Sequence, residues 1–69
     1  MELTTERFSM LLRELMKERN VTSAELARRS GVRADLVYKY RSGRYMPSAD
    51  KVCSIARALG VTPNDLLGW

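Results

Sequence analysis

The sequence predicts an all-α fold, a compact bundle of five short helices, and three observations support this class. Apolar residues recur three and four positions apart, and no segment alternates apolar and polar residues over the length of a strand. Capping residues stand where each apolar series begins, and glycine, asparagine or proline stands where it ends. With 69 residues, 45% of them hydrophobic, the chain is expected to form a single domain over residues 1–69.

The first helix is predicted from an apolar stripe near the N-terminus. Thr4 is the expected N-cap, and Asn20 is expected to close the helix because asparagine tolerates the left-handed conformation. The charged residues lie off the stripe, so this helix should turn one face to the core and the other to solvent. The stripe consists of Phe8, Leu11, Leu12, Leu15 and Met16.

Residues 22–42 hold two further helical patterns that meet at Gly31. Thr22 and Glu25 have the spacing of a capping box at the start of the first pattern. Gly31 stands where a residue with positive φ is usually needed. A helix, a tight turn and a second helix within about 20 residues form a helix-turn-helix, whose second helix can lie in a DNA major groove.

The second of these helices, at about residues 33–42, is expected to have two distinct faces. Advancing about 100° per residue from Val37 places five residues toward the core, namely Arg33, Leu36, Val37, Tyr40 and Arg41. The opposite face, which a groove would meet, holds Ala34, Asp35, Tyr38, Lys39 and Ser42.

That outward face has the chemistry to read bases. Lys39 can donate to a guanine edge or a phosphate, Asp35 can accept from the cytosine amino group, and Ala34 or Tyr38 can pack on a thymine methyl group. Asp35 would also repel phosphates. Its structural alternative is to complement the dipole at the helix start, where Arg33 supplies no capping oxygen.

The loop and helices that follow also carry residues that mark helix ends and helix starts. After Gly43 at the helix end, Arg44 and the Tyr45 hydroxyl could clamp a phosphate. Ser48 is expected to cap a fourth helix in which Cys53 is a small buried or half-buried hydrophobic residue. Residues 62–65 (Thr-Pro-Asn-Asp) predict the start of a short fifth helix.

The net charge of +4 is concentrated on one segment. Residues 22–46 carry six basic and two acidic side chains, while the acids and bases in the rest of the chain are equal in number. A surface that binds a polyanion requires such clustering. For Arg28, on the outside of the second helix, phosphate contact and plain solvation are both open.

Composition excludes several other classes of protein. There is no histidine, one cysteine and no metal-ligand cluster, so neither an enzyme nor a metal site is expected, and no cofactor or small-molecule ligand is indicated. No signal peptide or run of about 18 apolar residues is present, which favours a cytoplasmic protein without a membrane partner.

Three blocks resemble the Cro/C1-type helix-turn-helix family, also called Xre-like: VTSAELARRSGV, LVYKYRSGRYMPS and IARALGVTPNDLL. The resemblance implies the five-helix lambda-repressor-like DNA-binding fold, with helices two and three on DNA and dimers that read two half-sites. It places base reading on Ala34, Asp35, Tyr38 and Lys39. It places phosphate contacts on Ser23, Arg33, Arg41 or Ser42, and Arg44.

The chain departs from the family pattern at three places. Ser23 stands where glutamine is common, and Arg33 where serine or threonine is common. Many members pair an arginine late in helix one with a glutamate late in helix three, and those positions hold Met16 and Arg41 here. We expect the Arg41 stem to pack beside Met16 with its guanidinium facing outward, which adds positive charge to the binding side.

These observations predict a sequence-specific regulator of transcription that binds double-stranded DNA, expected to be a repressor acting as a homodimer on an operator. The alternative is a protein-interaction module, antitoxin-like or adaptor, that keeps the same fold. It is motivated by Ala34, Asp35 and the tyrosines at 38, 40 and 45, an unusual mixture for groove reading. For dimerisation, the apolar C-terminal residues Leu66, Leu67 and Trp69 could form a two-fold contact or fold back over the core.

Overall fold

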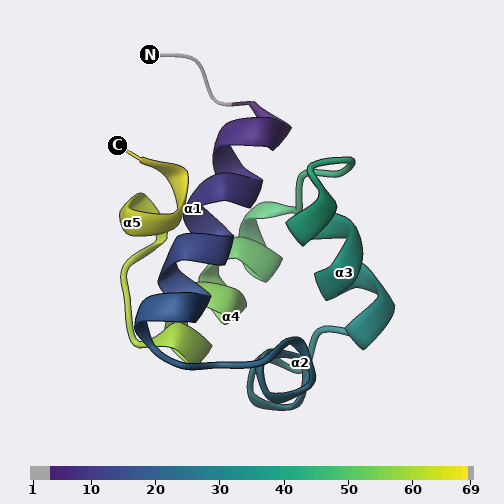
Figure 1. Cartoon of the computed structure of the whole chain (residues 1–69), viewed down its shortest axis with the longest axis vertical. Helices are drawn as coiled ribbons and strands as arrows, with labels where there is room; N and C mark the ends of the chain where they lie inside the picture. The colour runs from purple at the N-terminus through teal and green to yellow at the C-terminus, as the bar shows by residue number, and fades with distance from the viewer. Residues whose placement is uncertain (1–3, 69) are drawn as a thin grey trace.

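The computed structural model of the chain describes residues 4–68, and these form five helices with no strand among them. The helices are α1 (Thr5–Glu18), α2 (Ser23–Ser30), α3 (Ala34–Ser42), α4 (Ala49–Leu59) and α5 (Pro63–Leu67). Figure 1 shows α1 through the middle of the molecule, with α3 to one side, α5 to the other and α2 near the end of α1. The prediction of an all-α, five-helix fold is confirmed.

The hydrophobic core takes at least one side chain from every helix. Burial of each such side chain stabilises the fold by roughly 1.5–3 kcal/mol, and because each helix buries an apolar stripe, none of them is expected to be stable alone. One fully buried residue from each helix in turn is Phe8, Leu26, Val37, Ile55 and Leu66.

The predicted stripe of α1 packs into this core, with Leu11 and Leu15 only half-buried at its edges. Thr4 caps the helix, since its hydroxyl accepts from the backbone N–H of Arg7 at 3.0 Å. Ser9 is also buried, with 3% of its surface exposed, and this was not predicted. Its hydroxyl donates to the Glu6 carbonyl oxygen at 2.9 Å, which removes the cost of burying it.

Tyr40 of α3 belongs to the core. Its ring meets that of Phe8 edge to face, with centroids 6.3 Å apart and an interplanar angle of 82°. Only 4% of the residue is exposed, and burial raises the pKa of its phenol. The inward direction predicted for Tyr40 is therefore confirmed, and Tyr40 cannot be one of the surface anchors of a protein-interaction module.

Two expectations for α4 are wrong. Ser48 occupies the N-cap position, but its hydroxyl donates to the Asp50 carboxylate and makes no capping bond to the backbone; this contact lowers the pKa of Asp50. Cys53 is exposed, not buried. Successive helix residues are about 100° apart, and Val52 and Ile55 take the inward positions on either side of it.

Candidate nucleic-acid interface

α2, the turn at Gly31 and α3 form the helix-turn-helix that the sequence predicts. Thr22 Oγ1 accepts from the Glu25 backbone N–H at 3.1 Å, and the Glu25 carboxylate accepts from the Thr22 backbone N–H at 3.1 Å. The backbone bond from Thr22 is the main cause of the lowered pKa of Glu25. Gly31 has φ 76°, a left-handed conformation in which a side chain is disfavoured. The start and end of α2 are thus determined by residues close together in the sequence.

One face of α3, which we call the α3 outer face, points away from the core. Val37 and Tyr40 are buried on the opposite face, as helical geometry predicts, whereas Arg33, which was expected to point toward the core, is exposed. Tyr38 is 62% exposed and carries the largest side chain of the outer face. All five of the residues expected there are exposed, namely Ala34, Asp35, Tyr38, Lys39 and Ser42.

Asp35 is paired with Arg33 at the start of α3. Arg33 Nε lies 3.2 Å from Asp35 Oδ1, and a terminal nitrogen of the same guanidinium donates to Oδ2 at 3.2 Å. Both side chains are largely exposed, so the pair adds little to stability. Its effect is electrostatic, because the guanidinium offsets the negative charge that Asp35 presents on the outer face. As predicted, Arg33 provides no side-chain cap.

The end of α3 and the loop after it present further cations. The Lys39 ammonium lies 5.3 Å from the centroid of the Tyr45 ring, a cation–π contact. Tyr45 is 52% exposed, and Arg44 beside it is exposed as well. The Ser42 hydroxyl donates to the Lys39 carbonyl oxygen at 2.7 Å, so a phosphate contact from this hydroxyl requires that bond to be exchanged.

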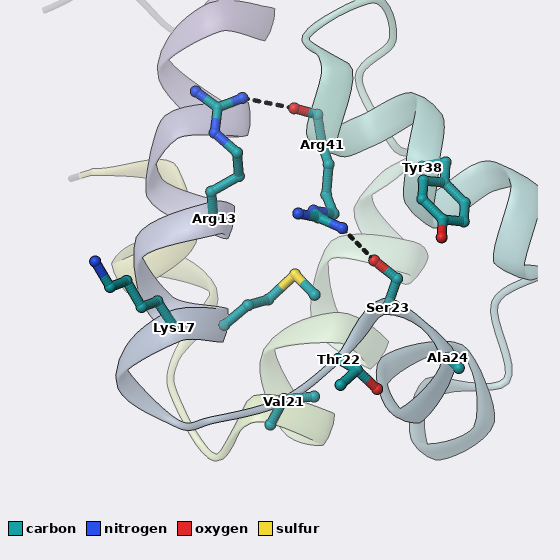
Figure 2. Close-up of a pocket in the computed structure, with 9 residues that line it drawn as sticks. Arg13, Lys17, Val21, Thr22, Ser23, Ala24, Tyr38 and Arg41 are labelled. Atoms are coloured by element: carbon teal, nitrogen blue, oxygen red, sulfur yellow. Dashed lines mark hydrogen bonds between the residues drawn. The ribbon is translucent and has the colours of Figure 1, made fainter.

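Arg41 does not point outward, and this prediction is wrong. Its guanidinium turns toward α2 and donates to the Ser23 hydroxyl, as Figure 2 shows. Its Nε is buried without a hydrogen-bond partner among the described residues. Met16 lines the same cleft as Arg41. The reason is the short side chain of Ser23. It leaves open a space that the glutamine common at this position would fill, and its hydroxyl oxygen accepts the hydrogen bond from Arg41.

Ser23 is therefore less available than expected. It is 8% exposed, and its hydroxyl accepts the bond from Arg41. Arg28 is exposed on α2, with no hydrogen bond or ion pair found for it among residues 4–68. Its neighbour Arg29 pairs with Glu25 at 3.4 Å.

Two cations of α1 were not singled out by the sequence reasoning. Arg13 and Lys17 lie one turn apart on α1, and both line the cleft beside α3 and the start of α2. In Figure 2 the Arg13 guanidinium points toward Arg41, whereas the Lys17 side chain points away from it. Arg13 donates to the Arg41 carbonyl oxygen at 2.6 Å. Their spacing of four residues was visible in the sequence, but their position off the apolar stripe was interpreted only as a solvated face.

The described residues expected at a dimer contact, Leu66 and Leu67, differ in their burial. Leu66 is fully buried in the core of its own chain, the second of the two alternatives left open for it. Leu67 is half-buried and lines an apolar hollow of about 300 Å³ beside Met46 and Cys53. Trp69 lies outside the described residues.

A capped helix, a glycine turn and a second helix with a fully exposed outer face define the helix-turn-helix class of domains. The sequence model of the Cro/C1-type HTH DNA-binding domain family matches residues 11–69, and the chain belongs to this family. The family is one of DNA-binding domains and is not an enzyme class.

The comparison with curated proteins is consistent with this family. An uncharacterized HTH-type transcriptional regulator of Methanothermobacter thermautotrophicus is 46% identical over 50 residues, which cover 72% of each chain. No solved structure matches the chain. Within residues 4–68, none of the helices has the length and apolar character needed to cross a membrane.

Proposed function

We propose that the chain is a sequence-specific regulator of transcription, a repressor, that binds double-stranded DNA with α3 in the major groove. The observation that carries the proposal is that every residue of the α3 outer face is exposed. This face belongs to residues 22–46, the segment that holds the net charge of +4. Such a helix fits the width of the major groove, and the clustered cations favour a polyanion. We take residues 1–69 to act as one DNA-binding domain.

Base reading is assigned to four residues of the outer face. Lys39 donates to guanine, Asp35 accepts from the amino group of cytosine, and the Tyr38 ring packs on a thymine methyl group, as does the Ala34 methyl. The Arg33 pair supports the role of Asp35, because it reduces repulsion between that carboxylate and the phosphates nearby. A wrong base at a position read in this way costs roughly 1–3 kcal/mol.

Phosphate contacts are assigned to polar side chains around that face. Exposed residues supply most of them, and the buried Ser23 hydroxyl with the inward Arg41 guanidinium supplies the rest from the cleft beside α2. These contacts position the domain without reading sequence. The set is Ser23, Arg28, Arg33, Arg41, Ser42, Arg44 and Tyr45.

Selection of bound duplexes from a random-sequence pool tests the proposal. We expect an operator with two related half-sites, their centres one helical turn or a multiple of it apart. Duplex affinity should fall linearly with salt on logarithmic axes, because phosphate contacts release counterions. Arg57→Ala, which removes an exposed cation from α4, is the matched control and should leave the selected sequence unchanged. Binding that is absent, or that ignores salt, would contradict the proposal.

We also propose that the regulator acts as a homodimer through its C-terminal end. Burial of Leu66 leaves Leu67, at the apolar hollow, and Trp69 to form the contact. Light scattering after size exclusion should give a dimer mass for the wild type and a lower mass for Leu67→Ala or Trp69→Ala. The exposed Cys53 thiol lines the same hollow, so its reaction with a thiol reagent should slow as protein concentration rises. A monomer mass at every concentration would rule the dimer out.

A protein-interaction module remains the second candidate, because Tyr38 and Tyr45 are 62% and 52% exposed and tyrosine is a frequent interface anchor. A pull-down from nuclease-treated lysate separates the two functions. A partner that is retained without DNA and lost in Tyr38→Ala favours the module. A partner released by nuclease favours the DNA-binding regulator.

A further inference from the structure

Asp35 and Lys39 carry opposite charges one helical turn apart on the α3 outer face, and both are exposed. An acidic residue four positions before a lysine is the favourable order for an ion pair along a helix. The two side chains nevertheless form no ion pair with each other within the described part of the chain. Each of them is held by a different neighbour.

Arg33 holds the Asp35 carboxylate from the start of α3. Its Nε and one terminal nitrogen reach the two carboxylate oxygens, both at 3.2 Å, so the contact is bidentate. A guanidinium fork fixes the direction of a carboxylate as well as offsetting its charge, which a lysine ammonium cannot do. An ionised carboxylate accepts about four hydrogen bonds, so Asp35 keeps sites for the amino group of a base while it is held.

The Tyr45 ring holds the Lys39 ammonium at the other end of the helix. Gly43, with φ 82°, turns the chain where α3 ends. Two residues further on, the centroid of the Tyr45 ring lies 5.3 Å from Lys39 Nζ. The attraction comes from the ring quadrupole and requires no hydrogen-bond acceptor, so the ammonium keeps donors for the edge of a base.

Neither contact is explained by the stability of the fold. The Arg33 and Asp35 side chains are 79% and 51% exposed, and Tyr45 is exposed and lies outside the hydrophobic core. Pairs as exposed as these add little to the free energy of unfolding. What both contacts change is the α3 outer face, because each draws one charged side chain away from the other.

We propose that Arg33 and Tyr45 are positioning residues that keep Asp35 and Lys39 apart so that each reads its own base pair, a role that rests on the proposed function. Residues four apart are separated by about 6 Å along a helix, and neighbouring base pairs by about 3.4 Å. The two side chains therefore reach base pairs one or two steps apart, where Asp35 accepts from cytosine and Lys39 donates to guanine. An ion pair between Asp35 and Lys39 would satisfy both groups and leave neither free to read a base.

The first arm of the test needs no DNA. The carbon-bound protons of Lys39 next to its ammonium are followed by NMR in the free protein, because an aromatic ring moves the signals of protons over its face upfield. This shift is expected in the wild type and in Tyr45→Phe, which keeps a ring, and should vanish in Tyr45→Leu. Arg57→Ala, at an exposed site of α4, is the control and should keep the shift. Thermal melts verify that the variants fold, and a wild type without the shift would overturn the role of Tyr45.

The second arm measures binding to the duplex selected from the random-sequence pool and to its single-base variants. The base pair that Lys39 reads is the one at which Lys39→Ala relaxes the preference. Tyr45→Leu should lower the preference for guanine at this base pair by about fivefold or more. Tyr45→Phe should keep that preference, although loss of the hydroxyl weakens binding to every sequence alike. Equal loss of preference in the two Tyr45 variants, or loss in neither, would contradict the positioning role.

Arg33 is tested in the same binding assay. Arg33→Ala frees the Asp35 carboxylate to pair with Lys39, so the preference should fall by about fivefold at both base pairs. Loss of a phosphate contact alone would instead weaken binding to all sequences alike. Asp35→Asn, added to Arg33→Ala, removes the carboxylate charge and should restore the preference at the base pair that Lys39 reads. Failure of this restoration would refute the role of Arg33.

Failure of the positioning roles is distinguishable from failure of the proposed function. A wild type that binds no duplex removes the proposed function and the reading of bases with it, even where the Lys39 shift is present. Duplex binding with base preferences that none of the Arg33 and Tyr45 variants alters overturns the positioning roles and leaves the proposed function intact.

Discussion

The Arg13 guanidinium of α1 donates a hydrogen bond of 2.6 Å to the backbone carbonyl oxygen of Arg41 in α3. That carbonyl lies in the last turn of α3, where C=O groups lack partners within the helix and the dipole is negative. Arg41 in turn bonds to Ser23 at the start of α2. Two arginines thus join α1, α3 and α2 in series and hold the α3 outer face at a defined angle to its neighbours.

Arg13→Ala should lower the free energy of unfolding by about 1 kcal/mol, because a charged donor to the end of α3 is lost. Urea denaturation measures the difference. Glu14→Ala is the control, since it changes the next exposed residue of the same helix to the same side chain without touching this bond. Equal losses in the two variants would show that the Arg13 contact contributes nothing to stability.

Gly43→Ala should destabilise the fold more than Gly31→Ala. Both glycines have left-handed φ, 82° and 76°, so alanine adds a strain of about 1–2 kcal/mol at either position. At Gly43 the new Cβ would also lie 3.2 Å from Ser9 Oγ, whereas nothing lies within 4 Å at Gly31. Chemical denaturation compares the two variants, and Ser9→Ala in the Gly43→Ala background should recover the excess loss. A larger loss at Gly31 would refute this account.

Acid should weaken the fold through its two capping boxes. Hydrogen bonds from the backbone of Thr22 and Thr62 hold the pKa values of Glu25 and Asp65 below their ordinary values of 4.5 and 3.8. A lowered folded-state pKa stabilises the protein above the unfolded pKa, and this stability is lost as pH falls through the folded pKa. Thermal unfolding should therefore show a melting temperature that declines below about pH 4.5. The decline should be shallower in Glu25→Gln and Asp65→Asn; an unchanged profile in both would dismiss these carboxylates as its source.

Lys39→Ala and Arg44→Ala should affect DNA binding differently. Loss of a base contact relaxes the preference at one position by about 1–3 kcal/mol, so Lys39→Ala should accept other bases there. Loss of a phosphate contact weakens all sequences alike, which is the expectation for Arg44→Ala. Competition binding with single-base operator variants makes the comparison. An identical uniform loss in both variants would place Lys39 on the phosphate backbone.

The helix boundaries were predictable because their signals are local. Thr22 and Glu25 form the capping box that their spacing indicates, and Gly31 adopts the positive φ expected of it. The same holds at Thr62 and Asp65, where the N–H and hydroxyl of one residue meet the carboxylate and N–H of the other. Residues three apart in sequence are close in space whatever the rest of the chain does, so no tertiary information is needed.

The cleft was not predictable in the same way, because its contacts join residues far apart in the chain. Arg41 was assigned an outward guanidinium from its family position, but the partner that turns it inward is Ser23, 18 residues earlier. Arg13 reaches α3 across 28 residues. Ser9 likewise lies close to the turn at Gly43, where an added Cβ would be 3.2 Å from its Oγ. Helical periodicity predicts the direction in which a side chain points from its helix, but it does not predict which residues of other helices that side chain contacts.

The side chains of the α3 outer face take no part in the hydrophobic core or in the hydrogen bonds that join α3 to α1 and α2. These side chains lie outside the core, and the bonds that orient α3 come from Arg13 and Arg41 on other faces. Exposed substitutions of this kind usually alter stability by less than about 0.5 kcal/mol. Mutations at Ala34, Tyr38 or Lys39 should therefore cost little stability, and under the proposed function a lineage can exchange one recognition specificity for another without passing through an unfolded ancestor.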